Sequence, residues 1–104
     1  MGHGEYSMKL SSKQRSYLKG LASKLDPVMQ IGKESLTPEI VKGLDDVLEA
    51  RELIKVSILK NCDDDPRAIA DTAAERTRSS AVQVIGRKFV LYRPSKKPKI
   101  VLPE

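Results

Sequence analysis

The chain has 104 residues, of which 39% are hydrophobic and 32% are charged, with a net charge of +5 and a single cysteine. This length suits one domain, and no apolar run approaches the roughly 20 residues that a membrane-spanning helix needs. Because Cys62 has no partner for an internal disulfide, a reducing compartment is favoured, and we expect a cytoplasmic monomer. The opening residues 1–7 read as an artificial extension before a natural start at Met8, so the predicted domain is 8–104.

The charges are segregated along the chain. Residues 1–33 hold six basic and two acidic side chains. Residues 34–75 hold five basic and eleven acidic ones, and residues 76–104 hold eight basic and one acidic one. If the two basic ends meet in space, they form one positive surface that faces away from an acidic one. Such a surface predicts a polyanionic partner, most often nucleic acid. The alternative is a solvated, lysine-rich surface that has no partner.

The first predicted element is a helix over residues 10–25, LSSKQRSYLKGLASKL. Ser11 and Gln14 have the spacing of a capping box, and Asp26-Pro27 is expected to end the helix, because the residue before proline avoids helical geometry. Four apolar residues recur on one face: Leu18, Leu21, Ala22 and Leu25. Basic residues lie on both flanks of that stripe, and three of them are predicted to contact a partner: Lys13, Arg15 and Lys19.

A short strand, PVMQI, leads through the loop GKES to a second helix. Thr37 is its expected N-cap and Pro38 its first helical residue. This helix carries much of the acidic segment, in particular Asp45, Asp46 and Glu49.

The next strand is ELIKVSILK, where Ile54, Val56 and Ile58 share one face and Leu53 and Leu59 lie on the other, which predicts an interior strand covered at least partly on both sides. A third helix follows within residues 65–77, and Asp65 is its expected N-cap.

Residues 81–92 predict a β-hairpin with a type II′ turn at Gly86-Arg87. The expected register pairs Val84 with Phe89 and Val82 with Leu91 on a face that packs against a helix; on the other face it pairs Gln83 with Val90 and Ala81 with Tyr92. The basic tail, about 94–104, is expected to be partly mobile.

The predicted order is therefore helix, strand, helix, strand, helix, strand, strand. Strands joined through helices favour parallel pairing, whereas a hairpin is antiparallel. We expect a single compact α/β domain with a four-stranded mixed sheet.

Candidates for catalysis are few. The one histidine, His3, lies in the presumed extension, so Ser-His-Asp and Cys-His sites are not expected. A lone Cys62 does not indicate zinc, and the run from Asp63 to Asp65 is better explained by a turn and a helix cap than by a cation. We expect a protein that is not an enzyme and that uses no metal or cofactor.

The loop that contains Gly32 and Lys33 is the most suggestive local feature. A helix N-terminus favours an anion, glycine lets a phosphate backbone approach closely, and Lys33 adds a positive charge. Glu34 and Glu39 oppose this, so a plain strand-to-helix connection is the alternative. Aromatic residues are few, and a nucleic-acid partner would therefore be held mainly through phosphates, which favours structured RNA.

Five segments together resemble one known family: LSSKQRSYLKGLA, PVMQIGKESLT, ELIKVSIL, VQVIGRKFVLYRP and KIVLP. From about Leu10 to Pro103 the chain resembles the stand-alone bacterial YhbY type of CRM domain (chloroplast RNA splicing and ribosome maturation). The resemblance implies a fold similar to the C-terminal domain of bacterial translation initiation factor 3. It also implies RNA binding and, in bacteria, association with precursors of the large ribosomal subunit.

The family's G-x-x-G loop places four residues at the expected RNA contact: Gly32, Lys33, Glu34 and Ser35. Ser35 stands where the second glycine is usual, and Arg78 replaces another usual glycine. Because serine resists a positive φ, a different bend of this loop is expected. Basic residues of the hairpin and tail complete the predicted RNA surface: Arg87, Lys88, Arg93, Lys96 and Lys97. A competing hypothesis is a protein-interaction adaptor that docks basic ribosomal proteins through the acidic second helix.

Overall fold

The computed structural model describes residues 9–104, so the predicted extension with its His3, and Met8, lie outside the described residues. Three helices and four strands follow in the predicted order: α1 (Ser12–Ala22), β1 (Met29–Ile31), α2 (Pro38–Arg51), β2 (Leu53–Ile58), α3 (Pro66–Thr77), β3 (Ser80–Ile85) and β4 (Lys88–Tyr92). The strands form one sheet in the order β1-β2-β4-β3. The β1–β2 pair is parallel and the other two pairs are antiparallel, which confirms the mixed sheet. Within residues 9–104, no helix is long and apolar enough to cross a membrane.

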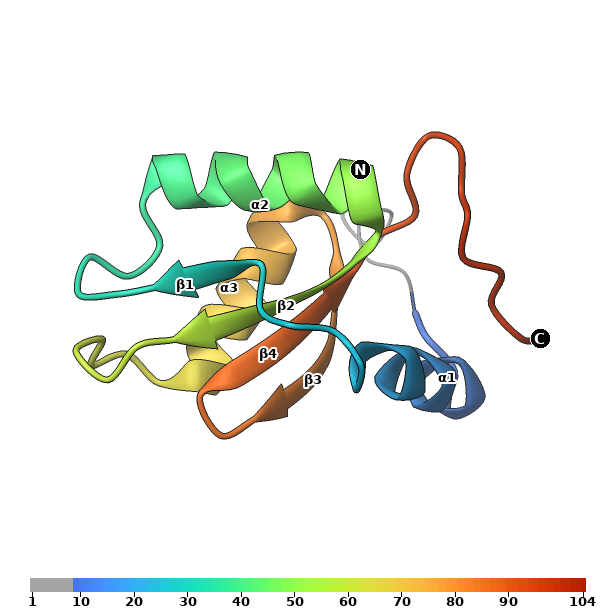
Figure 1. The fold of residues 1–104 in the computed structure, drawn as a ribbon, viewed down its shortest axis with the longest axis horizontal. Coiled ribbons are helices and arrows are strands. Elements are labelled where there is room, and N and C mark those ends of the chain that lie inside the picture. Colours follow the sequence, from blue (N-terminus) through green and yellow to red (C-terminus); the bar gives the residue numbers. More distant parts are fainter. Residues whose placement is uncertain (1–8) are drawn as a thin grey trace.

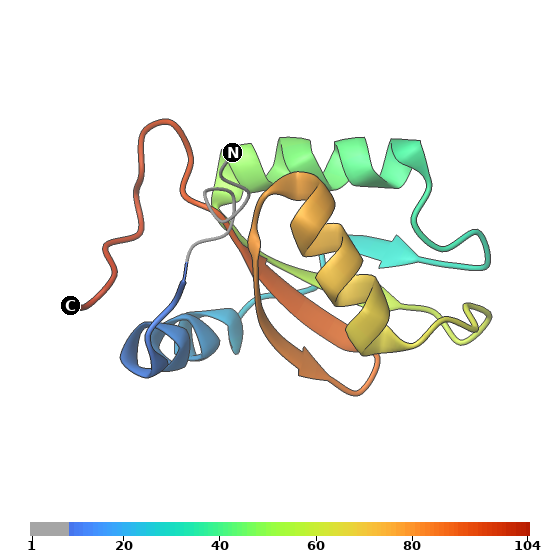
Figure 2. The same cartoon turned by 180° about the vertical axis from the view of Figure 1, so that it is seen from behind.

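The sheet separates two apolar clusters. Helices α2 and α3 lie on one side of it, and α3 is behind the sheet in Figure 1 and in front of it in Figure 2. The cluster on this side includes Ile54, Val56, Ile58, Phe89 and Leu91, together with residues of both helices. On the other face, α1 and the C-terminal tail cover a smaller cluster built on Leu18, Ala22, Leu53, Val82, Val90 and Tyr92. The predicted alternation along β2 is therefore correct.

Local signals set the helix starts. Ser11 and Gln14 form the predicted capping box, and Thr37 and Asp65 each accept a hydrogen bond from a backbone N–H of their helix. The end of α1 differs from the prediction, because the helix stops at Ala22 and not before Asp26. There the Leu25 N–H donates to the Ala22 carbonyl, an i to i−3 bond that replaces the helical pattern.

The hairpin has the predicted turn but not the whole predicted register. Gly86 has a φ of +56°, and Val84 pairs with Phe89 as expected. A β-bulge between Ala81 and Gln83 then moves Ala81 opposite Leu91. The predicted pairs Val82–Leu91 and Ala81–Tyr92 are therefore wrong, and Val82 packs on the α1 side of the sheet. The Arg15 guanidinium donates 2.8 Å hydrogen bonds to the carbonyls of both Ala81 and Val82, so a contact from a distant helix holds the bulge.

The tail is anchored by a buried carboxylate. Glu52 is 1% exposed and accepts hydrogen bonds from the Ser95 N–H and hydroxyl and from the N–H groups of Lys99 and Ile100. Beyond this anchor, Ile100 and Leu102 pack against the smaller cluster. These contacts give the segment after Arg93 a defined path, although the sequence led us to expect partial mobility.

Candidate functional site

The predicted loop is a tight turn. The Ser35 N–H donates to the Gly32 carbonyl at 2.9 Å, which leaves Lys33 and Glu34 exposed at its tip. Ser35 adopts a φ of +59°, so serine takes the left-handed conformation that glycine favours. The different bend expected for this loop is therefore not found, and serine adopts the positive φ in spite of its cost. Arg78, at the other position where the family usually has glycine, is also left-handed, with a φ of +58°, and caps α3.

The start of α2 is a poor anion site. Pro38 has no N–H, and the N–H of Ile40 is taken by the Thr37 hydroxyl oxygen at 3.1 Å. Glu39 adds a negative charge to the same turn. The part of the prediction that relied on free N–H groups at this helix start is therefore not supported, and the positive charge of Lys33 is what the loop offers to a phosphate.

The loop lies beside two other connections at one end of the sheet. A side chain at Gly32 would contact Asn61 and Leu59 of the β2–α3 connection at 3.5 and 3.6 Å. Arg87, in the hairpin turn, donates hydrogen bonds to the carbonyls of Ile58, Leu59 and Cys62. Arg87 was predicted to contact RNA, and here its guanidinium ties the hairpin to the end of β2.

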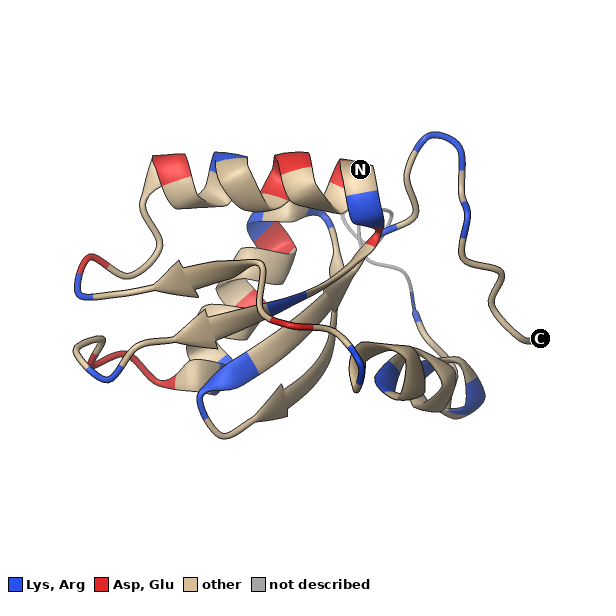
Figure 3. Ribbon diagram, in the orientation of Figure 1, with Lys and Arg blue, Asp and Glu red and all other residues tan. Residues whose placement is uncertain are grey.

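The sheet face that carries α1 is partly open to solvent at this end. Facing residues in the register place Gln30 beside Ser57, and Ser57 beside Lys88. Lys55 lies on the same face, two residues before Ser57. Lys33 and Lys60 lie in the loops that follow β1 and β2. Figure 3 shows basic positions along β2, at the start of β4 and in these two loops. We call this the open sheet face: Gln30, Lys33, Lys55, Ser57, Lys60 and Lys88.

The predicted basic residues of α1 belong to a different place. Arg15 and Lys19 line a groove of about 520 Å³ along β3, the edge strand, with Arg67 and Asp71 of α3 on its far side. The Arg15 guanidinium gives the groove a positive charge, although it also donates hydrogen bonds to the two carbonyls of the bulge. Lys13 is exposed on the first turn of α1.

The predicted tail residues lie at the opposite end of the molecule from the loop (Figure 1). Arg93 is mostly enclosed and binds Asp45 and Glu49 of α2 as well as the carbonyl of Thr77. Lys96 and Lys97 are exposed, and the backbone N–H of Lys96 donates to Glu49. The structure therefore places Lys33 and Lys88 on the open sheet face, Arg15 and Lys19 in the edge groove, and Arg93, Lys96 and Lys97 at the tail.

The electrostatics of the tail depend on Glu52. Burial acts to raise the pKa of this carboxyl, but the hydrogen bonds from Ser95, Ile100 and Lys99 outweigh burial and lower the pKa from 4.5 to about 2. Burial and the negative charge of Glu52 also raise the pKa of Tyr92. Glu52 is therefore ionised at neutral pH and keeps the tail docked.

Sequence reasoning missed Lys55, Lys60 and Glu52. The position of Lys55 could have been found, because it alternates with the buried residues Ile54 and Val56 and must point to the other face. Glu52 gave no such signal, since its partners lie more than 40 positions away. Within residues 9–104, no group of three or more metal-ligating side chains comes together, and Asp65 serves as the cap of α3.

Comparisons with known proteins agree with this architecture. Residues 10–93 match the CRS1 / YhbY (CRM) domain. A Bacillus subtilis protein named "Probable RNA-binding protein YqeI" is 43% identical over 90% of this chain and 99% of its own length. A Haemophilus influenzae protein named "RNA-binding protein" is 39% identical over 90% of this chain and 95% of its own length. The solution structure of a hypothetical protein from Staphylococcus aureus, described as a candidate RNA-binding protein, has a TM-score of 0.79 and 50% identity, covering 91% of this chain and all of that chain. The chain belongs to the CRS1 / YhbY (CRM) domain family.

Proposed function

We propose that this protein binds RNA and catalyses no reaction, and that the open sheet face is its main contact. Relatives that match nearly the whole chain are named as RNA-binding proteins. The observation that carries the proposal is the grouping of Lys33, Lys55, Lys60 and Lys88 around one uncovered part of the sheet. Among the described residues, these four ammonium groups have no hydrogen-bonding partner, so their charges are available to phosphates.

The surface favours contacts to phosphate over contacts to bases. Its polar residues are lysine, glutamine and serine, which reach backbone oxygens without reading sequence. The sheet face lacks the row of aromatic side chains on which several bases would stack, because Phe89 is buried in the larger cluster and Tyr92 in the smaller one. A folded RNA, in which phosphates from two strands converge, suits such a surface.

Lys33→Ala tests the loop directly. The expected result is a loss of RNA affinity on the order of 1–2 kcal/mol, because one charged contact to phosphate disappears. The melting temperature should not change, since the side chain is exposed at the tip of the turn. Lys42→Ala is the matched control: it removes one exposed lysine from the acidic helix. Equal affinities for both variants in a filter-binding assay would contradict a role for the loop.

We further propose that the bound RNA is ribosomal and that the protein acts on precursors of the large subunit. This rests on the family resemblance, and crosslinking in cells followed by sequencing of the bound RNA tests it. Reads concentrated in large-subunit ribosomal RNA are expected. Reads dominated by other RNAs would remove the assembly role and leave RNA binding in place.

The adaptor hypothesis has less support. Its three acidic residues are engaged within the molecule: Asp45 binds Arg93, Glu49 binds Arg93 and the Lys96 N–H, and Asp46 lies 3.4 Å from Lys42. A basic partner protein would have to displace these contacts.

A further inference from the structure

The end of the molecule that carries the tail has a second surface with features of a binding site. An apolar pocket of about 280 Å³ lies between α1, the segment before β1, the start of β2 and the tail. It is lined by Leu21, Leu25, Val28, Leu53 and Ile100, and by Arg51 as its charged member. Leu21 is 37% exposed, so the pocket opens to solvent.

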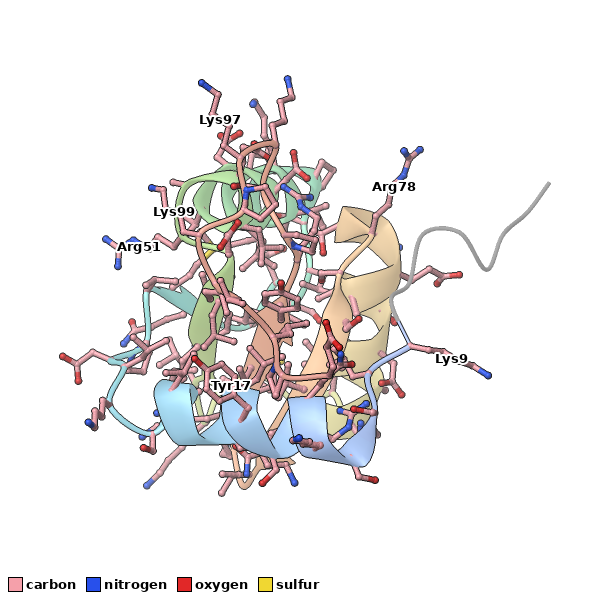
Figure 4. All side chains as sticks on the ribbon, turned by 90° about the vertical axis from the view of Figure 1, so that its right-hand side faces the viewer. Lys9, Tyr17, Arg51, Arg78, Lys97 and Lys99 are labelled. Carbon is pink, nitrogen blue, oxygen red and sulfur yellow. The ribbon has the colours of Figure 1, made fainter. Side chains whose placement is uncertain are left out.

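Positive charge flanks one side of this pocket. Figure 4 shows Arg51 and Lys99 projecting outward on the same side of this end of the molecule, and Tyr17 on the face of α1 turned toward the tail, whereas Lys97 projects from the far end of the tail loop, away from α1. The side chains of Lys97 and Lys99 make no hydrogen bonds with the residues that the structure describes. Asp26 is the acidic residue in the connection beside the pocket, and the charge of Glu52 is buried among N–H groups.

The basic loop is held in place before any partner arrives. Glu52 binds three backbone N–H groups from Ser95 to Ile100, and the Ser95 hydroxyl also donates to the Lys97 carbonyl at 3.0 Å. This fixes the backbone between Lys96 and Lys99 while the lysine side chains stay in solvent. A partner therefore meets cations carried on an ordered backbone, so little further backbone conformational entropy is lost on binding.

We propose that this second surface, the tail pocket, takes an unpaired nucleotide of the RNA, with the base in the apolar pocket beside Arg51 and its phosphate at Lys99. A planar base fits an apolar pocket whose charged member is a guanidinium, because arginine stacks on aromatic rings. The inference rests on the proposed function. It adds a preference for RNA in which a single-stranded nucleotide adjoins a duplex.

The test compares two RNAs: a blunt duplex, and the same duplex with a short single-stranded overhang. The wild-type protein should bind the overhang RNA about fivefold or more tightly, the lower end of what one base contact contributes. An overhang of abasic nucleotides should lose that preference while it keeps the same number of phosphates. The proposal would be overturned if the wild-type protein bound the overhang RNA and the blunt duplex with equal affinity. It would also be overturned if the abasic overhang were bound as tightly as the normal overhang.

Variants separate the two surfaces. Lys99→Ala and Leu21→Ser should each reduce the ratio of the two affinities, overhang RNA over blunt duplex, toward one. Lys33→Ala/Lys88→Ala should weaken both RNAs by a similar factor and leave the preference intact. Lys42→Ala should change neither the RNA affinity nor the ratio of the affinities for overhang and duplex.

If the tail variants keep the full preference for the overhang while Lys33→Ala/Lys88→Ala loses affinity, the tail-pocket proposal is wrong and the proposed function stands. If no RNA binds, both fail. If an acidic peptide with apolar anchors competes at the tail pocket but the abasic overhang behaves like the normal one, the partner is a protein.

Discussion

Within residues 9–104, three residues other than glycine have a positive φ: Ser35, Glu52 and Arg78. For a residue with a Cβ this geometry costs about 1–2 kcal/mol, so the surrounding contacts must support it. The supporting contacts differ. Ser35 is held by the short turn to Gly32, whereas Glu52 is held by its N–H bond to Leu48 and by the four donors on its carboxylate.

Ser35→Gly should raise stability by about 0.5–1 kcal/mol, because relief of the left-handed strain exceeds the extra chain entropy of glycine in the unfolded state. Urea denaturation would measure the gain. Ser35→Ala is the control, since it removes the hydroxyl and keeps the strain. A stability gain in the alanine variant as well would mean that the hydroxyl, and not the backbone, is unfavourable.

Glu52→Gln should destabilise the protein by about 2–3 kcal/mol at neutral pH, because a buried charged acceptor with several donors is replaced by a neutral amide. The pH dependence is more diagnostic. Since the folded pKa is about 2 and the ordinary value is 4.5, the wild type should lose about 3 kcal/mol as the pH falls from above 4.5 toward 2. The variant should lack that contribution. Unfolding curves between pH 7 and pH 2.5 that are parallel for both proteins would contradict the assignment.

At the scale of elements, the arginines are structural as well as cationic. Arg15 joins α1 to the bulge in β3, Arg87 joins the hairpin to the end of β2, and Arg93 joins β4 to α2 and α3. Each uses its planar fork to satisfy carbonyl groups at positions where strand or helix pairing ends. A lysine offers a single point charge there and lacks this geometry.

Arg15→Ala should therefore lower stability by about 1–2 kcal/mol, through two lost hydrogen bonds to the bulge, and it should also weaken RNA binding if the edge groove contributes. Lys19→Ala, one turn along the same helix and in the same groove, should spare stability. Thermal melts and RNA titrations of the pair separate the two roles. Unchanged melting of Arg15→Ala would show that the bulge does not need this contact.

The elements themselves were largely predictable because their signals are local. Ser11, Thr37 and Asp65 mark helix starts through contacts within three residues, and Gly86 fixes the hairpin turn. The bulge at Val82 was not predictable, since it depends on Arg15, which is 67 positions away. The role of Glu52 was hidden for the same reason. The periodicity of apolar residues along one strand does not show which distant side chain or N–H group will donate a hydrogen bond to a bulge carbonyl or to a buried carboxylate.

At the scale of the whole molecule, the basic residues are distributed over a body of 40 × 33 × 22 Å. The distribution of charge along the sequence predicted two basic ends. It did not predict that the sheet and α1 would divide the basic residues of these ends into three groups. The sequence does not show which half of a sheet face a helix leaves uncovered. The open sheet face emerges only when α1 covers Leu53, Val82, Val90 and Tyr92, leaving Lys55 half-buried and Lys88 exposed.

The salt dependence of RNA binding tests the central claim most directly, because it counts the phosphates neutralised by the open sheet face. The wild-type protein and Lys55→Ala/Lys88→Ala should be titrated with one structured RNA over a range of salt concentrations, with Lys42→Ala as the control. The account predicts a steep wild-type slope of log affinity against log salt, reduced by about one unit for each of the two lysines removed. A slope identical in wild type and double variant, with affinity unchanged, would contradict the claim that this face holds the RNA.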